Sequence, residues 1–423
     1  MDRSIVSLFI FVLAYILFVV FPAKRSLIAI IAAGLLLITR VLSLPEAFYF
    51  INWNVMGIFV GTLAVADVFM KSRVPAVIAE IIVDKAKNTA WAILLLCALA
   101  GFISAFVENV ATVLIIAPIA LALARKINLN PIKMMIAIAI SSNLQGAATL
   151  IGDPPSMLLA GFTKMNFGDF FLYKGKPSIF FAVELGAFVS FFVLMFLFRK
   201  GKHKVKVMPV EKVQSWIPSI FLALLIILLA VSSFFDTGFT CAAGIICMIM
   251  GIVSVVWEKI ANKGKVFELI RSLDWETTLF LVGIFILVGS LVSTGWINNI
   301  AQSLSSVIGG NIFFGYTLLV FISVIISAFV DNVPFLAAML PVAIQMASKL
   351  NVSPSLFLFG ILIGASLGGN ITPIGASANI ITCGLLKKEG YVVKFKDFMK
   401  IGIPFTLVAV TAAYLFVWFI WKP

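Results

Sequence analysis

The sequence predicts an all-α polytopic membrane protein built from two inverted repeats. Three observations carry this prediction. Of the 423 residues, 62% are hydrophobic and only 12% are charged. Residues 104–156 recur as residues 327–379 at a shift of 223 positions, with 19 of 53 residues identical. The basic residues gather in alternate loops between apolar segments. We expect about ten transmembrane helices, two re-entrant hairpins and two broken helices.

Apolar runs long enough to cross a bilayer occur along the whole chain. A spanning helix needs about 20 apolar residues, because the hydrocarbon core is about 30 Å thick. One such run could be a buried core helix, but this many in one chain indicate a membrane protein. The first run lacks the small-residue cleavage site of a signal peptide, so we interpret it as a retained span. The predicted spans are Ser4–Phe21, Ser26–Leu44, Val55–Met70, Ser178–Phe198, Ile217–Phe234, Phe239–Trp257, Thr277–Ser293 and Ile403–Ile420.

The internal repeat predicts how the chain divides. The run SAFVENV at Ser104–Val110 returns as SAFVDNV at Ser327–Val333. Duplicated halves with polar residues and helix breakers inside apolar sequence are typical of membrane transporters. We expect a first repeat over residues 1–199, a basic cytoplasmic linker over 200–214 and a second repeat over 215–423.

The distribution of basic residues predicts the orientation. If each half has five crossings and one hairpin that returns to its own side, 24 of the 31 Lys and Arg fall on one side and six on the other, with Arg40 inside a span. Basic loops stay in the cytoplasm, so both termini are predicted to lie outside the plasma membrane. The net charge of +13 is then a topology signal, and no nucleic-acid partner is expected. The predicted cytoplasmic loops are 22–25, 71–88, 125–133, 199–214, 259–276 and 387–401.

Two hairpins are predicted to enter the membrane without crossing it. The first, residues 89–124, enters from the cytoplasm, and the second, residues 311–348, enters from outside. The return arm Ala111–Ala124 has 14 residues, which is about 21 Å of helix and short of the hydrocarbon thickness. If both arms stop part-way, their tips meet near the middle of the membrane. If both arms cross, the tips are solvated turns at opposite surfaces.

Each predicted tip carries an acid followed by Asn, namely Glu108-Asn109 and Asp331-Asn332. An unpaired charge inside the membrane costs at least about 2.5–3.5 kcal/mol. A carboxylate, an amide oxygen and a helix end together suit a cation or a proton. We therefore expect these four residues to bind the coupling ion, either H⁺ or Na⁺. The alternative is that each acid pairs with Arg40 or caps a helix.

Each hairpin is followed by a helix that Gly and Pro residues interrupt. The segment Pro131–Thr163 breaks between Gln145 and Ser156, and its counterpart breaks between Gly368 and Asn379. Such breaks free backbone groups, and the N-terminus of the following half-helix favours an anion. A plain kink would not explain two matched breaks. The expected substrate-binding residues are Asn143, Gly146, Thr149, Gly152, Asp153, Pro154, Gly369, Asn370, Thr372, Pro373, Gly375, Ser377 and Asn379.

These motifs resemble the ion transporter superfamily over essentially the whole chain. Within it, SAFVENV with IGDPPS and SAFVDNVPFLAAMLP with NITPIG are similar to arsenical-pump membrane proteins and P-protein-like permeases, which carry a citrate-transporter-like domain. The resemblance implies a homodimer in which a scaffold domain holds a moving transport domain of hairpins and broken helices, operating as an elevator. Sodium-coupled members carry Ser-Asn-Thr at both tips. Only the Asn is present here, so proton coupling is at least as strongly indicated as sodium coupling.

The substrate follows less directly from the sequence. The resemblance makes arsenite or antimonite efflux the first expectation, with a Na⁺/H⁺ antiporter or a carboxylate or inorganic anion permease as alternatives. Neither break contains Arg or Lys, which suits a neutral metalloid or a small monovalent ion better than a multiply charged anion. The four scattered cysteines form no close pair for a metalloid, and we expect no metal site or cofactor. They are Cys97, Cys241, Cys247 and Cys383.

Other classes of protein fit the sequence less well. An ion channel would need one continuous pore, which two inverted halves with separate acids do not favour. A membrane enzyme would need a nucleophile with a base, and the one histidine, His203, lies in the basic linker, so we expect no catalytic residues. The chain has no GxxxxGK[ST] phosphate loop. The resemblance still allows a separate soluble ATPase as a partner.

Overall fold

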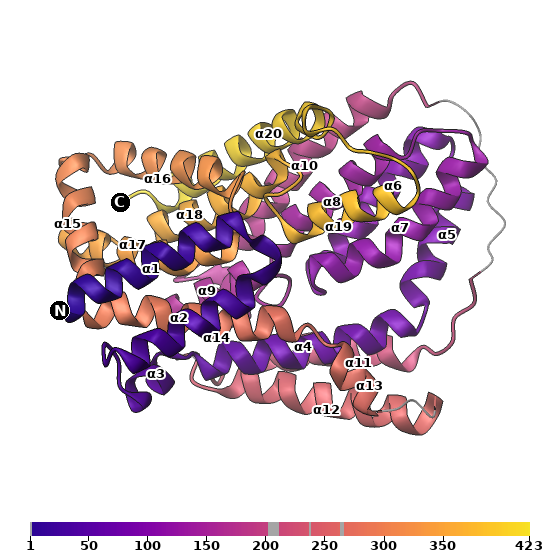
Figure 1. Cartoon of the computed structure of the whole chain (residues 1–423). Coiled ribbons are helices and arrows are strands. Elements are labelled where there is room, and N and C mark those ends of the chain that lie inside the picture. The colour runs from indigo at the N-terminus through magenta and orange to yellow at the C-terminus, as the bar shows by residue number, and fades with distance from the viewer. Residues whose placement is uncertain (1, 202–210, 237, 263–265) are drawn as a thin grey trace.

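The computed structural model describes residues 2–201, 211–236, 238–262 and 266–423 (Figure 1). This part of the chain is almost entirely helical. Its one sheet is the short antiparallel pair β1 (Leu172–Tyr173) and β2 (Lys176–Pro177). Seven helices in the described residues are long and apolar enough to cross a membrane. Every predicted span overlaps a helix, which confirms the all-α polytopic class.

The α-helices of the two halves correspond in the same order, so that α1 corresponds to α11 and α10 to α20. The first half contains α1 (Arg3–Val20), η1 (Pro22–Lys24), α2 (Arg25–Ile38), α3 (Leu44–Phe50), α4 (Trp53–Lys71), α5 (Val74–Lys85), α6 (Thr89–Ser104), α7 (Asn109–Lys126), α8 (Ile132–Gly146), α9 (Pro154–Thr163), η2 (Gly168–Phe170) and α10 (Ile179–Phe198). The second half contains α11 (Ile217–Ser232), α12 (Ala242–Asn262), α13 (Val266–Ser272), α14 (Trp275–Ser293), α15 (Trp296–Ile308), α16 (Ile312–Ser327), α17 (Asn332–Lys349), α18 (Ser355–Gly368), η3 (Gly369–Ile371), α19 (Ser377–Lys388) and α20 (Phe395–Trp421).

Matched residues form matched local structure in the two halves. The Asn88 side chain caps α6 by accepting the Trp91 N–H, and Asn311 caps α16 in the same way, each at 3.0 Å. The indole N–H of Trp53 donates to a carbonyl five residues earlier, at 3.2 Å, and that of Trp275 does the same, at 2.7 Å. The sequence repeat is therefore a structural repeat.

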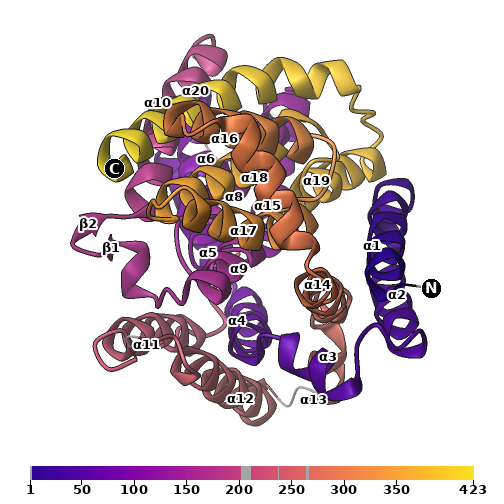
Figure 2. The ribbon, with the colours of Figure 1, turned by 90° about the vertical axis from the view of Figure 1, so that its left-hand side faces the viewer.

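The helices form two groups, which are separated in the end-on view of Figure 2. Helices α1–α4 and α11–α14 line one side of the molecule, and the hairpins, the broken helices, α10 and α20 form the other. Within the first group the halves interlock, because α4 packs along α12 and α2 packs along α14. A glycine permits the α4–α12 contact, since a Cβ at Gly61 would lie 2.2 Å from the Cys247 carbonyl carbon.

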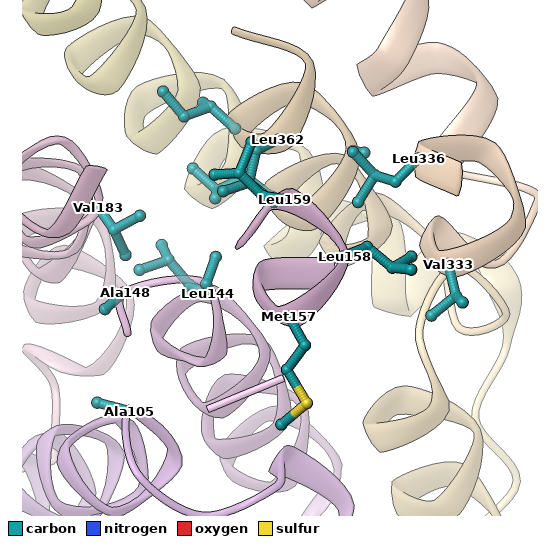
Figure 3. Packing of buried hydrophobic residues seen from close by; sticks show 14 of the residues in the cluster. Ala105, Leu144, Ala148, Met157, Leu158, Leu159, Val183, Val333, Leu336 and Leu362 are labelled. Atoms are coloured by element: carbon teal, nitrogen blue, oxygen red, sulfur yellow. The ribbon is translucent and has the colours of Figure 1, made fainter. Parts of the chain in front are cut away.

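The two hairpins lie at opposite ends of the molecule. Figure 1 shows α6 and α7 near α5 at one end and α16 and α17 near α15 at the other. Each return arm packs against the other half's second half-helix, α17 on α9 and α7 on α19. In Figure 3, Leu158 of α9 points toward Val333 and Leu336 of α17, while Leu159 lies beside Leu362 of α18. The halves therefore share one apolar core.

Two sequence expectations about helix ends were wrong. The return arm of the first hairpin is the 18-residue helix α7, about 27 Å long, so the length argument for re-entry is weaker than predicted. Helix α2 ends at Ile38, and Arg40 lies beyond it as an exposed residue in a left-handed turn instead of inside a span. Of the basic linker, residues 202–210 lie outside the described part of the chain.

Candidate functional site

Both tip acids cap the return arm that follows them. The Glu108 carboxylate accepts the Ala111 N–H at 3.1 Å, and the Asp331 carboxylate accepts the Val333 N–H at 3.0 Å. Aspartate is among the best N-cap residues, and an acid at this position also meets the positive end of the helix dipole. The alternative that each acid caps a helix is therefore confirmed. It does not remove either acid from the site, because each cap uses only some of the carboxylate's lone pairs.

The two tips meet at one cavity of about 40 Å³. Both acids, Glu108 and Asp331, line it, together with the asparagines that follow them. The volume is enough for a few water molecules or a small ion. The expected site residues that line the cavity are Glu108, Asn109, Asn143, Asp153, Pro154, Asp331, Asn332 and Ser377.

A chain of amides runs from this cavity into both helix breaks. The Asn109 amide donates to Asp153 at 3.2 Å and to Asn143 at 3.1 Å. Asn143 in turn donates to the Asn370 side-chain oxygen at 2.9 Å and to the Ser366 carbonyl at 3.0 Å. These side chains are buried, and buried amides that share hydrogen bonds hold one another in fixed positions. The network connects the first tip to the broken helix of each half.

The remaining predicted residues lie in the helix breaks, and several of them form hydrogen bonds there. The Thr149 hydroxyl donates to the Ala105 carbonyl, and Thr372 donates to Ala328 in the equivalent way. Asn379 donates to the carbonyls of Gly369 and Thr372, at 3.0 Å each. Pro373 lies in the loop between η3 and α19.

The glycines of the breaks allow two backbone segments to touch. A Cβ at Gly152 would lie 2.5 Å from the Gly146 carbonyl oxygen, and one at Gly375 would lie 2.5 Å from that of Gly369. Side chains do not fit at such distances. The glycines therefore let the backbone of each break pack closely against itself and against the neighbouring hairpin; they are Gly146, Gly152, Gly369 and Gly375.

Three of the cavity residues that have polar side chains were not predicted: Arg25, Asp274 and Thr277. The Arg25 guanidinium forms an ion pair with Asp331 and donates to the Thr277 hydroxyl at 3.2 Å. Thr277 donates to Asp274 at 2.6 Å. Arg25 belongs to the predicted cytoplasmic loop 22–25, and in the structure it is the first residue of α2 and its side chain lines the cavity. Arg40, which the alternative interpretation paired with the acids, does not line the cavity.

The cavity has more carboxylates than cations. Glu108, Asp153, Asp274 and Asp331 line it, and Arg25 is the one basic residue among the described residues that do so. Asp153 is only 5% exposed. Taking carboxylates out of water is costly, so protons or small cations would stabilise this arrangement. Among the described residues, no group of three or more His, Cys, Asp or Glu is placed to hold a metal ion.

Two other acids of the spans have local partners. Asp67 pairs with Lys71 one turn along α4, at 2.8 Å. Glu184 accepts a hydrogen bond from Gln145 at 3.1 Å in a separate, mostly apolar pocket that also contains Cys97. Neither acid lines the cavity between the tips. The structure therefore places both acids outside the candidate site.

Comparison with known proteins identifies the family. The family model described as "Citrate transporter" matches residues 15–351 and 337–423. An uncharacterized transporter of Mycobacterium bovis is 29% identical over 98% of both chains. The human P protein is 25% identical over 87% of this chain and 54% of its own length. Among solved structures, the YdaH transporter of Alcanivorax borkumensis has a TM-score of 0.65 at 13% identity, covering 99% of this chain and 98% of its own. The chain is thus a multi-pass membrane transporter that belongs to the citrate transporter family.

Proposed function

We propose that this protein is a secondary active transporter of the plasma membrane that moves a small anion or metalloid, coupled to H⁺ or Na⁺. One observation carries the proposal: residues from both halves line a single small cavity with four carboxylates and one arginine. Carriers with internal repeats bind substrate and coupling ion where the repeats meet. The cavity lies at that place, because it is lined by both tips and by the start of both second half-helices.

The excess of carboxylates supports coupling to a cation. An anion that enters a cavity already lined by acids needs positive charge to accompany it. Protons on Glu108, Asp153 or Asp331 would provide it, and so would Na⁺ held by carboxylate and amide oxygens. The Asn at each tip is compatible with either ion, and neither tip has the Ser or Thr hydroxyl of the sodium-coupled pattern.

The two helix groups support an elevator mechanism, for which the resemblance in sequence implies a homodimer. The hairpins and broken helices share a core, whereas Arg25, Asp274 and Thr277 reach the cavity from the other group. The cavity therefore lies at the boundary between a candidate transport domain and a candidate scaffold. The hairpins also lie at opposite ends of the molecule (Figure 1), which is the arrangement that inverted repeats require for alternating access.

Arsenite or antimonite efflux remains the first candidate reaction. None of the four cysteines, all of which lie in the described part of the chain, lines the cavity, so the metalloid would be carried as a neutral hydroxide that hydrogen-bonds to amides and acids. The family description favours the alternative of a carboxylate permease, and the excess of acids favours Na⁺/H⁺ exchange. A separate soluble ATPase is proposed as a partner only for the metalloid reaction.

Flux measurements on the purified full chain would separate these reactions. The protein is reconstituted in liposomes that contain a pH-sensitive dye, a sodium gradient is imposed, and arsenite, antimonite or citrate is then added. A sodium-driven pH change before any addition identifies an antiporter. A pH change only on adding a metalloid or citrate identifies that substrate with proton coupling. If radiolabelled substrates and ²²Na⁺ also fail to move, the proposal is wrong.

A further inference from the structure

We propose that Arg25 is the anion-binding residue of the cavity, and that a compact monovalent anion replaces Asp331 on its guanidinium while Asp331 takes up one proton. The inference rests on the proposed function, because it specifies the substrate class and the coupling at the same cavity. It depends on the ion pair between Arg25 of α2 and the tip of the second hairpin.

The surroundings of Arg25 hold its guanidinium ready for an anion. The side chain is 18% exposed and that of Asp331 is 24% exposed, so water and small solutes can reach the pair. The Thr277 hydroxyl accepts one N–H at 3.2 Å, and the Phe280 ring lies 5.2 Å from the guanidinium carbon. An arginine that is held by an aromatic ring and a hydroxyl can use its remaining N–H groups as a planar fork, which donates two parallel hydrogen bonds to a carboxylate. Asp331 currently occupies a position on that fork.

The total charge of the cavity predicts that anion binding is coupled to proton uptake. Five charged side chains line the cavity, of which Arg25 alone among the described residues is positive. An anion that arrives on Arg25 adds one negative charge, and a proton on Asp331 removes one. The exchange keeps the total charge of the cavity constant, whereas an anion without a proton would increase the repulsion among carboxylates.

The groups that face Asp331 determine when it takes up the proton. Arg25 favours its ionised form, while Glu108, Asp153 and Asp274 across the same cavity favour its protonated form. The phenol of Tyr15 on α1 reaches the same hairpin, where it donates to the Pro334 carbonyl at 2.5 Å. When the anion neutralises Arg25, the ionised form of Asp331 loses its ion-pair partner and keeps only the Val333 N–H and the helix end, so anion binding and proton uptake favour each other.

Size and charge define the substrate class. A cavity of about 40 Å³ fits an anion of a few heavy atoms. One guanidinium neutralises one negative charge, and a trianion such as citrate would bring two further charges toward four acids. We therefore expect a planar monoanion with one carboxylate-like group, for which acetate is a suitable probe.

Calorimetry on the purified full chain tests the proposal. Acetate is titrated at several pH values in two buffers that differ in ionisation enthalpy, so that proton uptake is measured along with affinity. The wild type should take up about one proton per acetate bound where Asp331 is otherwise ionised. Asp331→Asn should bind acetate at least as tightly without taking up a proton. Arg25→Gln should lose about 10- to 100-fold in affinity.

Further variants separate binding from misfolding. Arg25→Lys keeps the charge but loses the fork, so acetate should bind several-fold more weakly than to wild type. Lys24→Gln removes the neighbouring exposed charge and should behave like wild type. Unchanged acetate affinity in Arg25→Gln overturns the proposal. So does proton uptake that persists in Asp331→Asn, or tight binding of citrate but not of acetate.

The result is independent of the test of transport. If the wild type carries out Na⁺/H⁺ exchange or metalloid flux in liposomes but binds no acetate, the anion site is wrong and the coupled carrier stands. If acetate binds through Arg25 with proton uptake while no flux of any kind occurs, the site stands and the transport proposal fails.

Discussion

At the scale of single residues, Glu108 and Asp331 each combine two roles, because the same carboxylate caps a helix and lines the cavity. Glu108→Gln and Asp331→Asn retain an oxygen that can accept the capping N–H, but they cannot release or bind a proton. We predict that each substitution abolishes coupled proton or sodium movement in liposomes while yield and monodispersity stay normal. Near-normal coupled flux in both variants would contradict the proposed role of the acids.

The glycines of the breaks give a prediction about stability. A methyl group at Gly152 or Gly375 would lie 2.5 Å from a carbonyl oxygen, so each Gly→Ala substitution should destabilise the protein by about 1–3 kcal/mol or more. Gly384→Ala is the matched control, since a Cβ there meets nothing within 4 Å on α19, and it should be neutral or slightly stabilising. Thermal unfolding in detergent measures all three. Equal melting temperatures would show that the breaks relax easily.

The sequence predicted the residues that the repeat duplicates and missed those that it does not. Glu108 and Asp331 stood out because each recurs at the matched position of the other half. Arg25 has no such counterpart, since α12, the equivalent of α2, begins with Ala242-Ala243-Gly244. Its position in a short basic loop favoured a surface location, and only the packing of α2 on α14 brings it to Asp331.

At the scale of helices, the packing of α4 on α12 gives a further prediction. Gly61→Ala should force these helices apart, because its Cβ would lie 2.2 Å from the backbone of Cys247. In a chain that retains Cys247 as its sole cysteine, we expect the buried thiol to resist a maleimide in wild type and to react in the variant. Gly34→Ala, at an open position on α2, should leave the labelling unchanged. A thiol that stays protected in Gly61→Ala would show that the interface adapts.

Hydropathy located the helices well but their ends less well. The apolar run of the first return arm stops at Ala124, whereas α7 continues through Arg125 and Lys126. Basic residues in the last turn interact favourably with the negative end of a helix, so the helix outlasts the apolar pattern. The second return arm likewise ends on Lys349. A helix boundary drawn from apolar residues alone is therefore too short at both hairpins.

At the scale of the whole molecule, the orientation of the two halves across the membrane can be tested at the C-terminal ends of the two return arms. Lys126 and Lys349 are equivalent exposed residues, 223 positions apart, at the last residue of α7 and of α17. If the repeats are inverted, these ends lie on opposite sides of the membrane. The positive-inside rule places Lys126 in the cytoplasm and Lys349 outside.

Cysteine labelling in intact cells tests this orientation directly. In a chain without its native cysteines, Lys349→Cys should react with an impermeant maleimide added outside, and Lys126→Cys should react only after the membrane is permeabilised. Both sites are exposed helix ends of the same local structure, so a difference in labelling reports the side of the membrane rather than burial. The reverse pattern would overturn the orientation but keep the inversion. Labelling of both sites from one side would mean that the halves are parallel. It would exclude an alternating-access mechanism in which two inverted halves exchange roles.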